Sequence, residues 1–154
     1  MRERYAPLPE KSTVARTVIA GRGHFPEGNV LPKPEWLEPD GEDKKAALES
    51  GREPGLSVWD TAVATPRQAW LHREVPIPEA RYRAFAVAVD ALLGVASRHA
   101  RKVEVVADPI EPVPPEWHDG HSLVEGMRKP VGVAKVAHRD FLDDAILAFE
   151  EVAV

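Results

Sequence analysis

The sequence predicts one α+β domain, in which a small mixed or antiparallel sheet packs against one long helix and one C-terminal helix. Three observations lead to this class. The 154 residues are 44% hydrophobic and 29% charged, as in ordinary globular domains. Short segments dense in β-branched residues occur together with two segments of helical period. Fifteen prolines and ten glycines predict rigid turns and Pro-rich loops between these elements.

The chain is expected to begin with an arm and a strand. Residues 1–13 are polar and contain two prolines, so we interpret them as an extended N-terminal arm, and residues 14–154 as a single globular α+β domain. The segment 14–20 is dense in β-branched residues and is followed by Gly21, which together predict the first strand.

The next segments alternate between loop, helix and strand. Residues 28–39 hold three prolines around Trp36, which predicts a loop with one buried aromatic anchor. The charged segment 42–50 predicts two helical turns that end at Gly51. Residues 55–60 have the composition of a short strand.

A second short helix has a clear start signal in the sequence Thr65-Pro66-Arg67-Gln68. Thr is a favoured N-cap, Pro is favoured at the first helical position, and Gln three residues after the cap completes a capping box. The helix is expected to be short because Pro76 follows it.

The longest predicted helix spans residues 78–102. Its apolar residues recur at steps of three and four, which is the pattern of one buried helical face. Basic residues in its last turns would complement the helix dipole. The apolar stripe is Tyr82, Phe85, Ala86, Val89, Leu92, Leu93 and Ala96, and the basic residues are Arg98, Arg101 and Lys102.

The last third of the chain is predicted to contain three strands and the C-terminal helix. Residues 103–107, 122–124 and 131–136 have strand composition. Residues 108–115 hold four prolines and predict a loop, and residues 140–152 have the pattern of an amphipathic helix. The solvated face of that helix would carry Asp143, Asp144, Glu150 and Glu151.

Composition and charge exclude several classes. The absence of Cys excludes a disulfide scaffold, a thiolate metal site and a Cys nucleophile. No segment approaches the roughly 18 consecutive apolar residues of a membrane span, and the charged N-terminus lacks the apolar run of a secretory signal. The net charge of −5 argues against a nucleic-acid partner, which needs a basic footprint. We therefore expect a cytoplasmic protein that binds no cofactor.

The richest cluster of chemically active side chains is Trp117-His118-Asp119-Gly120-His121, which follows the Pro-rich segment beginning at Asp108. Imidazoles act as general bases and carboxylates orient them, so His118 and His121 with Asp108 or Asp119 form a candidate catalytic site. A metal site would need further ligands at recognisable spacing, so we expect no metal. The alternative is that His118 caps a turn and that the His121 ring bonds to backbone.

Candidate binding residues lie elsewhere in the chain. Arg22 stands between two glycines, where backbone could approach an anion, although a turn that requires positive φ explains both glycines equally well. Trp36, Trp59 and Trp117 lie at the edges of predicted elements. They could stack on a ligand or fill gaps in the core.

Several short motifs resemble a group of small bacterial proteins of unassigned function. The resemblance covers about residues 30–126 and implies a bacterial, cytosolic protein, without an activity that transfers. The chain departs from the group in its Ala-rich predicted helix and in the expanded loop before His118. The motifs are Trp36 in a Pro-flanked segment, Gly55-Leu56-Ser57-Val58 with Asp60, Thr65-Pro66, Asp108-Pro109 and His121.

A second resemblance is to ADP-ribosyltransferases, which place Arg or His, Ser and Glu on three successive strands. Arg22, Ser57 and Glu125 occur here in that order. The resemblance implies an ADP-ribosyltransferase-like fold as a third interpretation. The chain departs from the family because its Ser-Thr-Ser and Glu-x-Glu patterns are both absent.

The sequence as a whole favours a small cytosolic protein-binding or accessory module without catalysis. No catalytic set closes in the sequence, and rigid Pro-rich loops suit a fixed recognition surface. The expected partner is another protein rather than a membrane or a nucleic acid. The alternative is a small enzyme that uses His121 or His118 with Asp108 or Asp119 for acid–base or metal-assisted hydrolytic chemistry.

Overall fold

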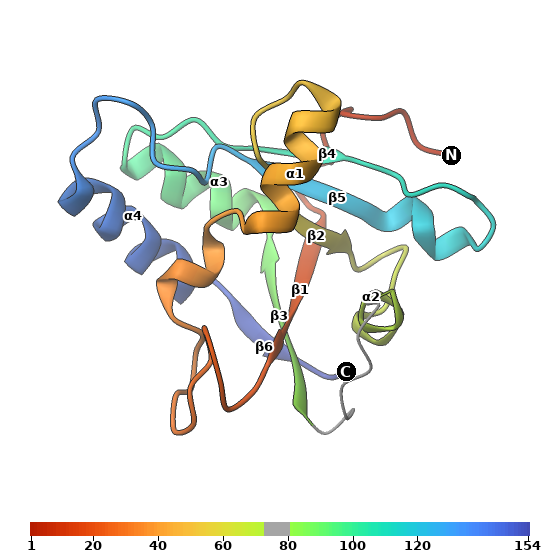
Figure 1. Ribbon diagram of the computed structural model, residues 1–154, viewed down its shortest axis with the longest axis horizontal. Helices are drawn as coiled ribbons and strands as arrows, with labels where there is room; N and C mark the ends of the chain where they lie inside the picture. Colours follow the sequence, from red (N-terminus) through yellow and green to blue (C-terminus); the bar gives the residue numbers. More distant parts are fainter. Residues whose placement is uncertain (73–80) are drawn as a thin grey trace.

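The computed structural model describes residues 1–72 and 81–154, and in them one six-stranded sheet organises the chain (Figure 1). The strand order is β4-β5-β2-β1-β3-β6, and every neighbouring pair is antiparallel. This arrangement confirms the predicted α+β class and selects the antiparallel form of the sheet. The strands are β1 (Thr13–Ile19), β2 (Leu56–Asp60), β3 (Tyr82–Ala88), β4 (Glu104–Ala107), β5 (His121–Glu125) and β6 (Glu150–Val152).

The helices cover the sheet unequally. One face packs against α3, α4 and the short 3₁₀ helix η1, which together with the sheet form the main hydrophobic core. The opposite face carries a smaller cluster around Trp59, to which Ala69 of α2 and Trp117 of η3 contribute. Figure 1 shows α3 and α4 on one side of the molecule and α2 on the other. The helices are α1 (Gly41–Ser50), α2 (Pro66–Leu71), α3 (Val89–Arg98) and α4 (Lys135–Leu147), with η1 (Pro34–Leu37) and η3 (Glu116–Gly120).

The predicted long helix over residues 78–102 is wrong in its first half. Residues Tyr82–Ala88 form β3 at the interior of the sheet, and α3 begins only at Val89. The strand is buried on both faces, so its apolar residues are nearly continuous and also fit a helical stripe. Pairing with all seven residues of β1 decides for the strand. Residues 78–80, the predicted start of this helix, lie outside the described residues.

Two boundaries near the C-terminus also differ from the prediction. The predicted strand over residues 131–136 is absent from the described structure, where this segment turns and leads into α4 at Lys135. The C-terminal helix starts and ends earlier than expected, and Glu150–Val152 forms the edge strand β6 beside β3. Glu151 therefore pairs with Arg83 across two strands at 2.8 Å rather than lying on a solvated helix face.

Several local predictions are confirmed. The strands over 14–20, 55–60, 103–107 and 122–124 form with shifts of one residue or two. Thr65 accepts a hydrogen bond from the Gln68 N–H, and the Gln68 side chain accepts from the Thr65 N–H, which completes the capping box of α2. Local chemistry thus places these helix and strand boundaries correctly.

The N-terminal arm lies along the free edge of β4. The Tyr5 N–H donates to the Ala107 carbonyl at 2.6 Å, and the Leu8 N–H donates to the Val105 carbonyl at 2.9 Å. Pro7 bridges to Val106 in the same antiparallel direction. These bonds satisfy edge groups of β4 that would otherwise remain open.

Arg101 has a different role from the predicted one, because it lies beyond the end of α3. Its guanidinium donates to the Gly126 and Arg128 carbonyls at 2.8 and 3.0 Å and lies 4.3 Å from the Phe141 ring centroid. Arg101 therefore holds the loop after β5 against α4 rather than complementing a helix dipole.

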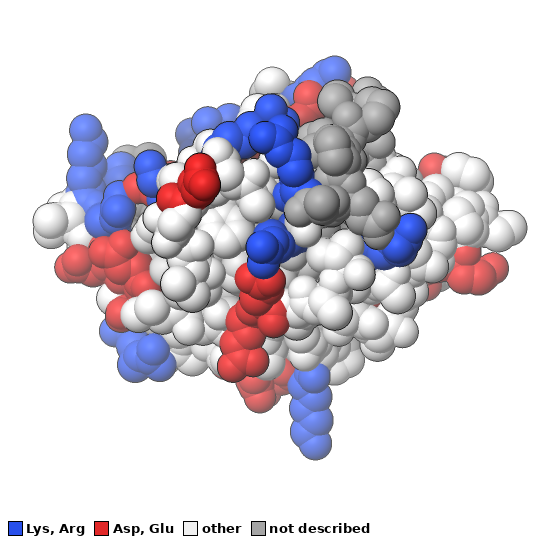
Figure 2. Space-filling model, turned by 90° about the horizontal axis from the view of Figure 1, so that it is seen from below, with Lys and Arg blue, Asp and Glu red and all other residues white. Residues whose placement is uncertain are grey.

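The surface mixes both signs of charge. Figure 2 shows acidic and basic side chains interspersed on an otherwise uncharged face of the molecule. Within residues 1–72 and 81–154, no helix combines the length and the apolar composition that crossing a membrane requires.

Candidate functional site: a Ser-His-Asp group across three strands

Strand register brings Ser57, His121 and Asp108 together on one face of the sheet. Trp59 of β2 pairs with His121 of β5, so Ser57, two residues before Trp59, points to the same face as His121. Asp108 directly follows β4, and its N–H donates to the His121 carbonyl at 2.9 Å. The three residues therefore come from three adjacent strands, β2, β5 and β4.

The hydrogen bonds of His121 define which ring nitrogen carries the proton. Its Nδ1 lies 2.8 Å from the Asp108 carbonyl oxygen and 3.3 Å from Oδ2 of the same residue. A carbonyl oxygen only accepts hydrogen bonds, so Nδ1 must be the donor. In the neutral ring Nε2 is then unprotonated, and it lies 2.6 Å from Ser57 Oγ. The Ser57 hydroxyl donates to it, which is the arrangement of a nucleophile and its general base.

Asp108 is held as a carboxylate. Burial opposes its ionisation, but the hydrogen bond and charge of His121 and the charge and hydrogen bond of Arg4 outweigh burial, so the pKa of Asp108 lies below its ordinary value. Arg4 ion-pairs with Oδ1, and His121 Nδ1 faces Oδ2. A negative charge is thus available beside the imidazole across the pH range of most enzymes.

The surroundings restrain the imidazole and leave the serine partly accessible. The indole of Trp59 lies edge to face with His121, with ring centroids 5.0 Å apart. The His121 side chain is 12% exposed, whereas Ser57 is half-buried. The base is therefore fixed by packing.

The other two predicted catalytic residues lie outside this group. His118 Nδ1 bonds to the Pro112 carbonyl at 2.8 Å, which ties the Pro-rich loop to η3. Asp119 accepts a hydrogen bond from the Arg2 N–H at 2.5 Å. The structure therefore joins Asp108 and His121 to each other, and it gives His118 and Asp119 contacts to the loop and to the N-terminal arm.

Sequence reasoning did not assign a nucleophile, and it missed Ser57, which the structure places against His121. Ser57 entered only through the two resemblances, without a role as a nucleophile. The sequence holds one local signal, because Ser57 lies in the segment 55–60 that has strand composition. The convergence of Ser57, Asp108 and His121 could not be inferred without the strand order.

The predicted binding residues occupy different environments. Trp36 is 2% exposed and packs against Phe85 and Phe149 in the main core, so it is the buried anchor expected of its loop. Trp59 is buried and Trp117 is half-buried in the second cluster. Arg22 lies in a turn after β1, and a β-bridge between Arg22 and Phe25 closes this turn.

The residues of the ADP-ribosyltransferase resemblance come together only in part. Ser57 pairs with Leu123, and Glu125 lies two residues further along β5 on the same face. The Glu125 carboxylate is bound by Arg52. Within the described part of the chain, Arg22 forms no hydrogen bond or ion pair with Ser57 or Glu125.

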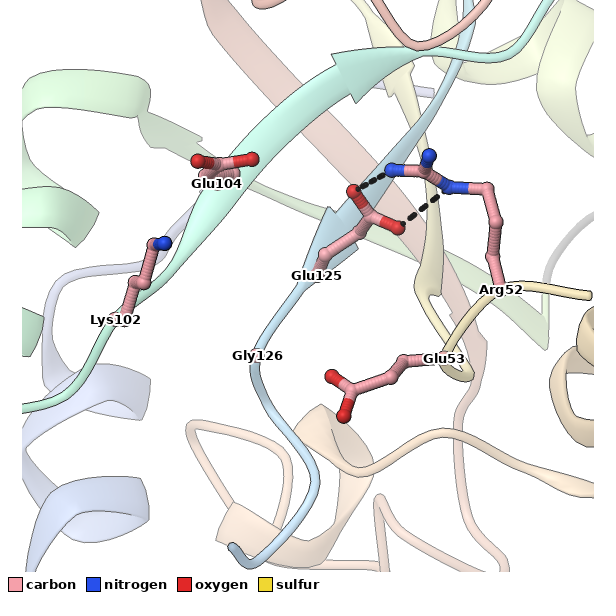
Figure 3. A pocket seen from close by; sticks show the side chains of 6 residues that line it. All are labelled: Arg52, Glu53, Lys102, Glu104, Glu125 and Gly126. Carbon is pink, nitrogen blue, oxygen red and sulfur yellow. Dashed lines mark hydrogen bonds and ion pairs between the residues drawn. The ribbon is translucent and has the colours of Figure 1, made fainter.

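A hollow lies at the end of β5, where Glu125 lines it together with Arg52 (Figure 3). Its volume is about 350 Å³, and Arg52 forms one side through a bidentate pair with Glu125 at 2.6 and 3.0 Å. The Arg52 guanidinium also stacks on the Tyr5 ring at 3.9 Å, which links the hollow to the N-terminal arm. The lining residues are Arg52, Glu53, Lys102, Glu104, Glu125 and Gly126.

The described residues contain no group of three or more His, Cys, Asp or Glu side chains placed to hold a metal ion. Comparisons of the chain with protein-family models, with curated proteins and with solved structures find no match. The case for a function therefore rests on the geometry of the site.

Proposed function

We propose that the protein is a small enzyme of the acyl-transfer type, in which Ser57 attacks an ester or amide carbonyl. His121 is the general base and Asp108 orients it. The observation that carries the proposal is the unbroken chain of contacts from Ser57 Oγ to His121 Nε2 and from His121 Nδ1 to Asp108. This assignment develops the enzyme interpretation of the sequence and replaces His118 and Asp119 by Ser57.

The proposed reaction follows from the proton positions. Ser57 Oγ forms a bond to the carbonyl carbon of the substrate while its proton moves to His121 Nε2. His121 then gives that proton to the leaving alcohol or amine, and an ester on Ser57 remains. Water, deprotonated by His121, hydrolyses this ester and restores the serine hydroxyl. The Asp108 carboxylate stabilises the charged imidazole in both halves of the reaction.

A hollow near the end of β5 offers space for part of a substrate. Glu125, which lines this hollow, lies two residues along β5 from Leu123, the partner of Ser57, and residues two apart on a strand are about 7 Å apart. A substrate could place its carbonyl at Ser57 and its remaining part in this hollow.

Labelling with a fluorophosphonate tests the proposal directly. Such probes phosphonylate a serine that a neighbouring base activates. We expect a single adduct on Ser57 by mass spectrometry and hydrolysis of activated aryl esters, both lost in Ser57→Ala and His121→Ala. A loss of at least about 100-fold in rate is expected for His121→Ala, from the usual contribution of a general base.

A second His–Asp pair provides the matched control. His99 Nε2 lies 2.6 Å from Asp144 Oδ2, and no serine among the described residues hydrogen-bonds to the His99 ring. His99→Ala and the exposed Ser97→Ala should therefore keep labelling and hydrolysis. If Ser57 stays unlabelled in the folded protein, its hydrogen bond to His121 only satisfies two polar groups, and the proposal is wrong.

The protein-binding module expected from the sequence predicts a different result. That interpretation expects no turnover and a specific protein that co-purifies from the host lysate. Ester hydrolysis that depends on Ser57 and His121 would decide for the enzyme.

A further inference from the structure

The N-terminal arm carries an arginine into the Ser57 site. Arg4 ion-pairs with the Asp108 carboxylate through one terminal nitrogen, and its other terminal nitrogen donates to the Pro109 carbonyl at 2.7 Å. The neighbouring residue Tyr5 bonds through its N–H to Ala107, the last residue of β4. Arg4 is therefore held at the position where β4 ends and Asp108 begins.

The two carboxylate oxygens of Asp108 have different partners. Oδ1 accepts from Arg4, and Oδ2 lies 3.3 Å from His121 Nδ1. Asp108 begins a Pro-rich loop, and its side chain can rotate unless its partners restrain that rotation. The planar guanidinium, held at two points, supplies that restraint.

We propose that Arg4 is a positioning residue of the Ser57 site, which turns the Asp108 carboxylate toward His121 and whose positive charge favours the neutral imidazole. This inference rests on the function proposed above. It assigns the arm a part in the reaction without a contact to substrate.

The charges around His121 determine the direction of the expected effect. On the side of the arm, Arg2 and Arg4 face Asp60, Asp108 and Asp119, so two positive and three negative charges leave one net negative charge. On the other side, the rings of His72 and Trp117 contact Trp59, and His118 lies against Trp117. Loss of the Arg4 charge makes the first group more negative, and this favours protonation of His121.

The test compares the wild-type protein with Arg4→Gln in two measurements. One is the pH dependence of ester hydrolysis, and the other is an NMR titration of the His121 ring protons. We expect both midpoints to be higher in Arg4→Gln than in the wild-type protein, because the loss of a nearby positive charge favours the protonated imidazole. Arg4→Lys should restore the midpoint but keep a lowered kcat, because an ammonium lacks the planar fork.

Two further variants separate positioning from a structural role of the arm. Arg2→Gln removes another anchor of the same arm, at Asp60 and Asp119, and should move the midpoint less than Arg4→Gln. Arg83→Gln removes a charge at the β3–β6 edge and should leave the His121 midpoint unchanged.

The outcomes for Arg4 and for the proposed function are distinct. An unchanged His121 midpoint in Arg4→Gln, or an equal shift in Arg2→Gln, would overturn the role of Arg4. Wild-type turnover no greater than that of Ser57→Ala would refute the proposed function, and the NMR titration would still show whether Arg4 acts on His121.

Discussion

Two carboxylates, Asp40 and Asp43, share the first turn of α1. Each side chain accepts a hydrogen bond of 2.9 Å from the backbone N–H of the other residue, which forms the capping box. The pKa of Asp43 is raised to about 6, chiefly by burial and also by the charge of Asp40, against the hydrogen bond from the Asp40 N–H. Ionised Asp43 therefore lowers the stability of the folded protein near neutral pH.

Replacing Asp43 by Asn should stabilise the protein at neutral pH. The pKa of Asp43 is about 6 in the folded state and 3.8 in the unfolded state. The contribution of this carboxyl to stability is therefore complete below pH 3.8, where it is protonated in both states, and is lost as the pH rises through 6. Asn can still accept the Asp40 N–H without the charge. Melting temperatures between about pH 4 and 8 should show Asp43→Asn above wild type at the neutral end, with a difference that vanishes toward the acidic end.

Glu42 offers the control for this experiment. It is an exposed acid in the same helical turn, so Glu42→Gln should follow the wild-type pH profile. A melting temperature of Asp43→Asn below wild type at neutral pH would show that the capping box needs the charged carboxylate.

At the scale of elements, the end of β5 depends on Gly126. Its φ is +98°, a conformation that L side chains rarely adopt, and a Cβ built there would lie 2.2 Å from the Lys102 carbonyl oxygen. Lys102 lies two residues before the start of β4. The absence of a side chain at Gly126 therefore allows the chain before β4 and the loop after β5 to approach closely.

Gly126→Ala should therefore destabilise the protein by about 3–5 kcal/mol, the upper range of single substitutions. Gly132 is the matched control, because its φ is also positive, at +85°, but no atom lies within 4 Å of the position that a Cβ would take there. Gly132→Ala should cost about 1–2 kcal/mol from backbone strain alone. Urea unfolding of both variants measures the difference, and equal losses would show that the Lys102 contact relaxes freely.

At the scale of the whole molecule, Phe85 connects distant parts of the chain. Its side chain is fully buried in β3, and its ring lies 5.4 Å from Phe25 and 5.9 Å from Trp36. Trp36 in turn contacts Phe149, next to β6. The aromatic group therefore joins the loop after β1, η1, the interior of the sheet and the C-terminal segment.

Phe85→Ala should cost about 3–5 kcal/mol, the usual loss for a buried aromatic residue, out of roughly 5–15 kcal/mol for a whole domain. Arg83→Ala, two residues away on the same strand, should cost less than about 1 kcal/mol, because its pair with Glu151 is exposed. Thermal melts compare the two. If Phe85→Ala melts like wild type, the main core does not depend on this aromatic group.

The sequence by itself determined the features that depend on neighbouring residues. The capping box at Thr65, the helix end at Gly51 and the strand β2 follow from side-chain bonds and backbone preferences within a few positions. The class of the fold and the buried anchor Trp36 also followed from local pattern. The contact between Asp108 and His121 was within reach for the same reason, since only 13 residues separate them.

Only the tertiary structure decided the placement of Ser57 and the identity of β3. Ser57 lies 64 residues before His121, and the register of β2 against β5 alone places its hydroxyl at Nε2. The segment Tyr82–Ala88 fits both a strand and a helical face, and pairing with β1, which lies far earlier in the chain, selects the strand. Arg4 reaches Asp108 across 104 residues. In each case the deciding hydrogen bonds form between segments whose spacing in sequence carries no signal, because long-range pairing depends on the energy of the whole sheet.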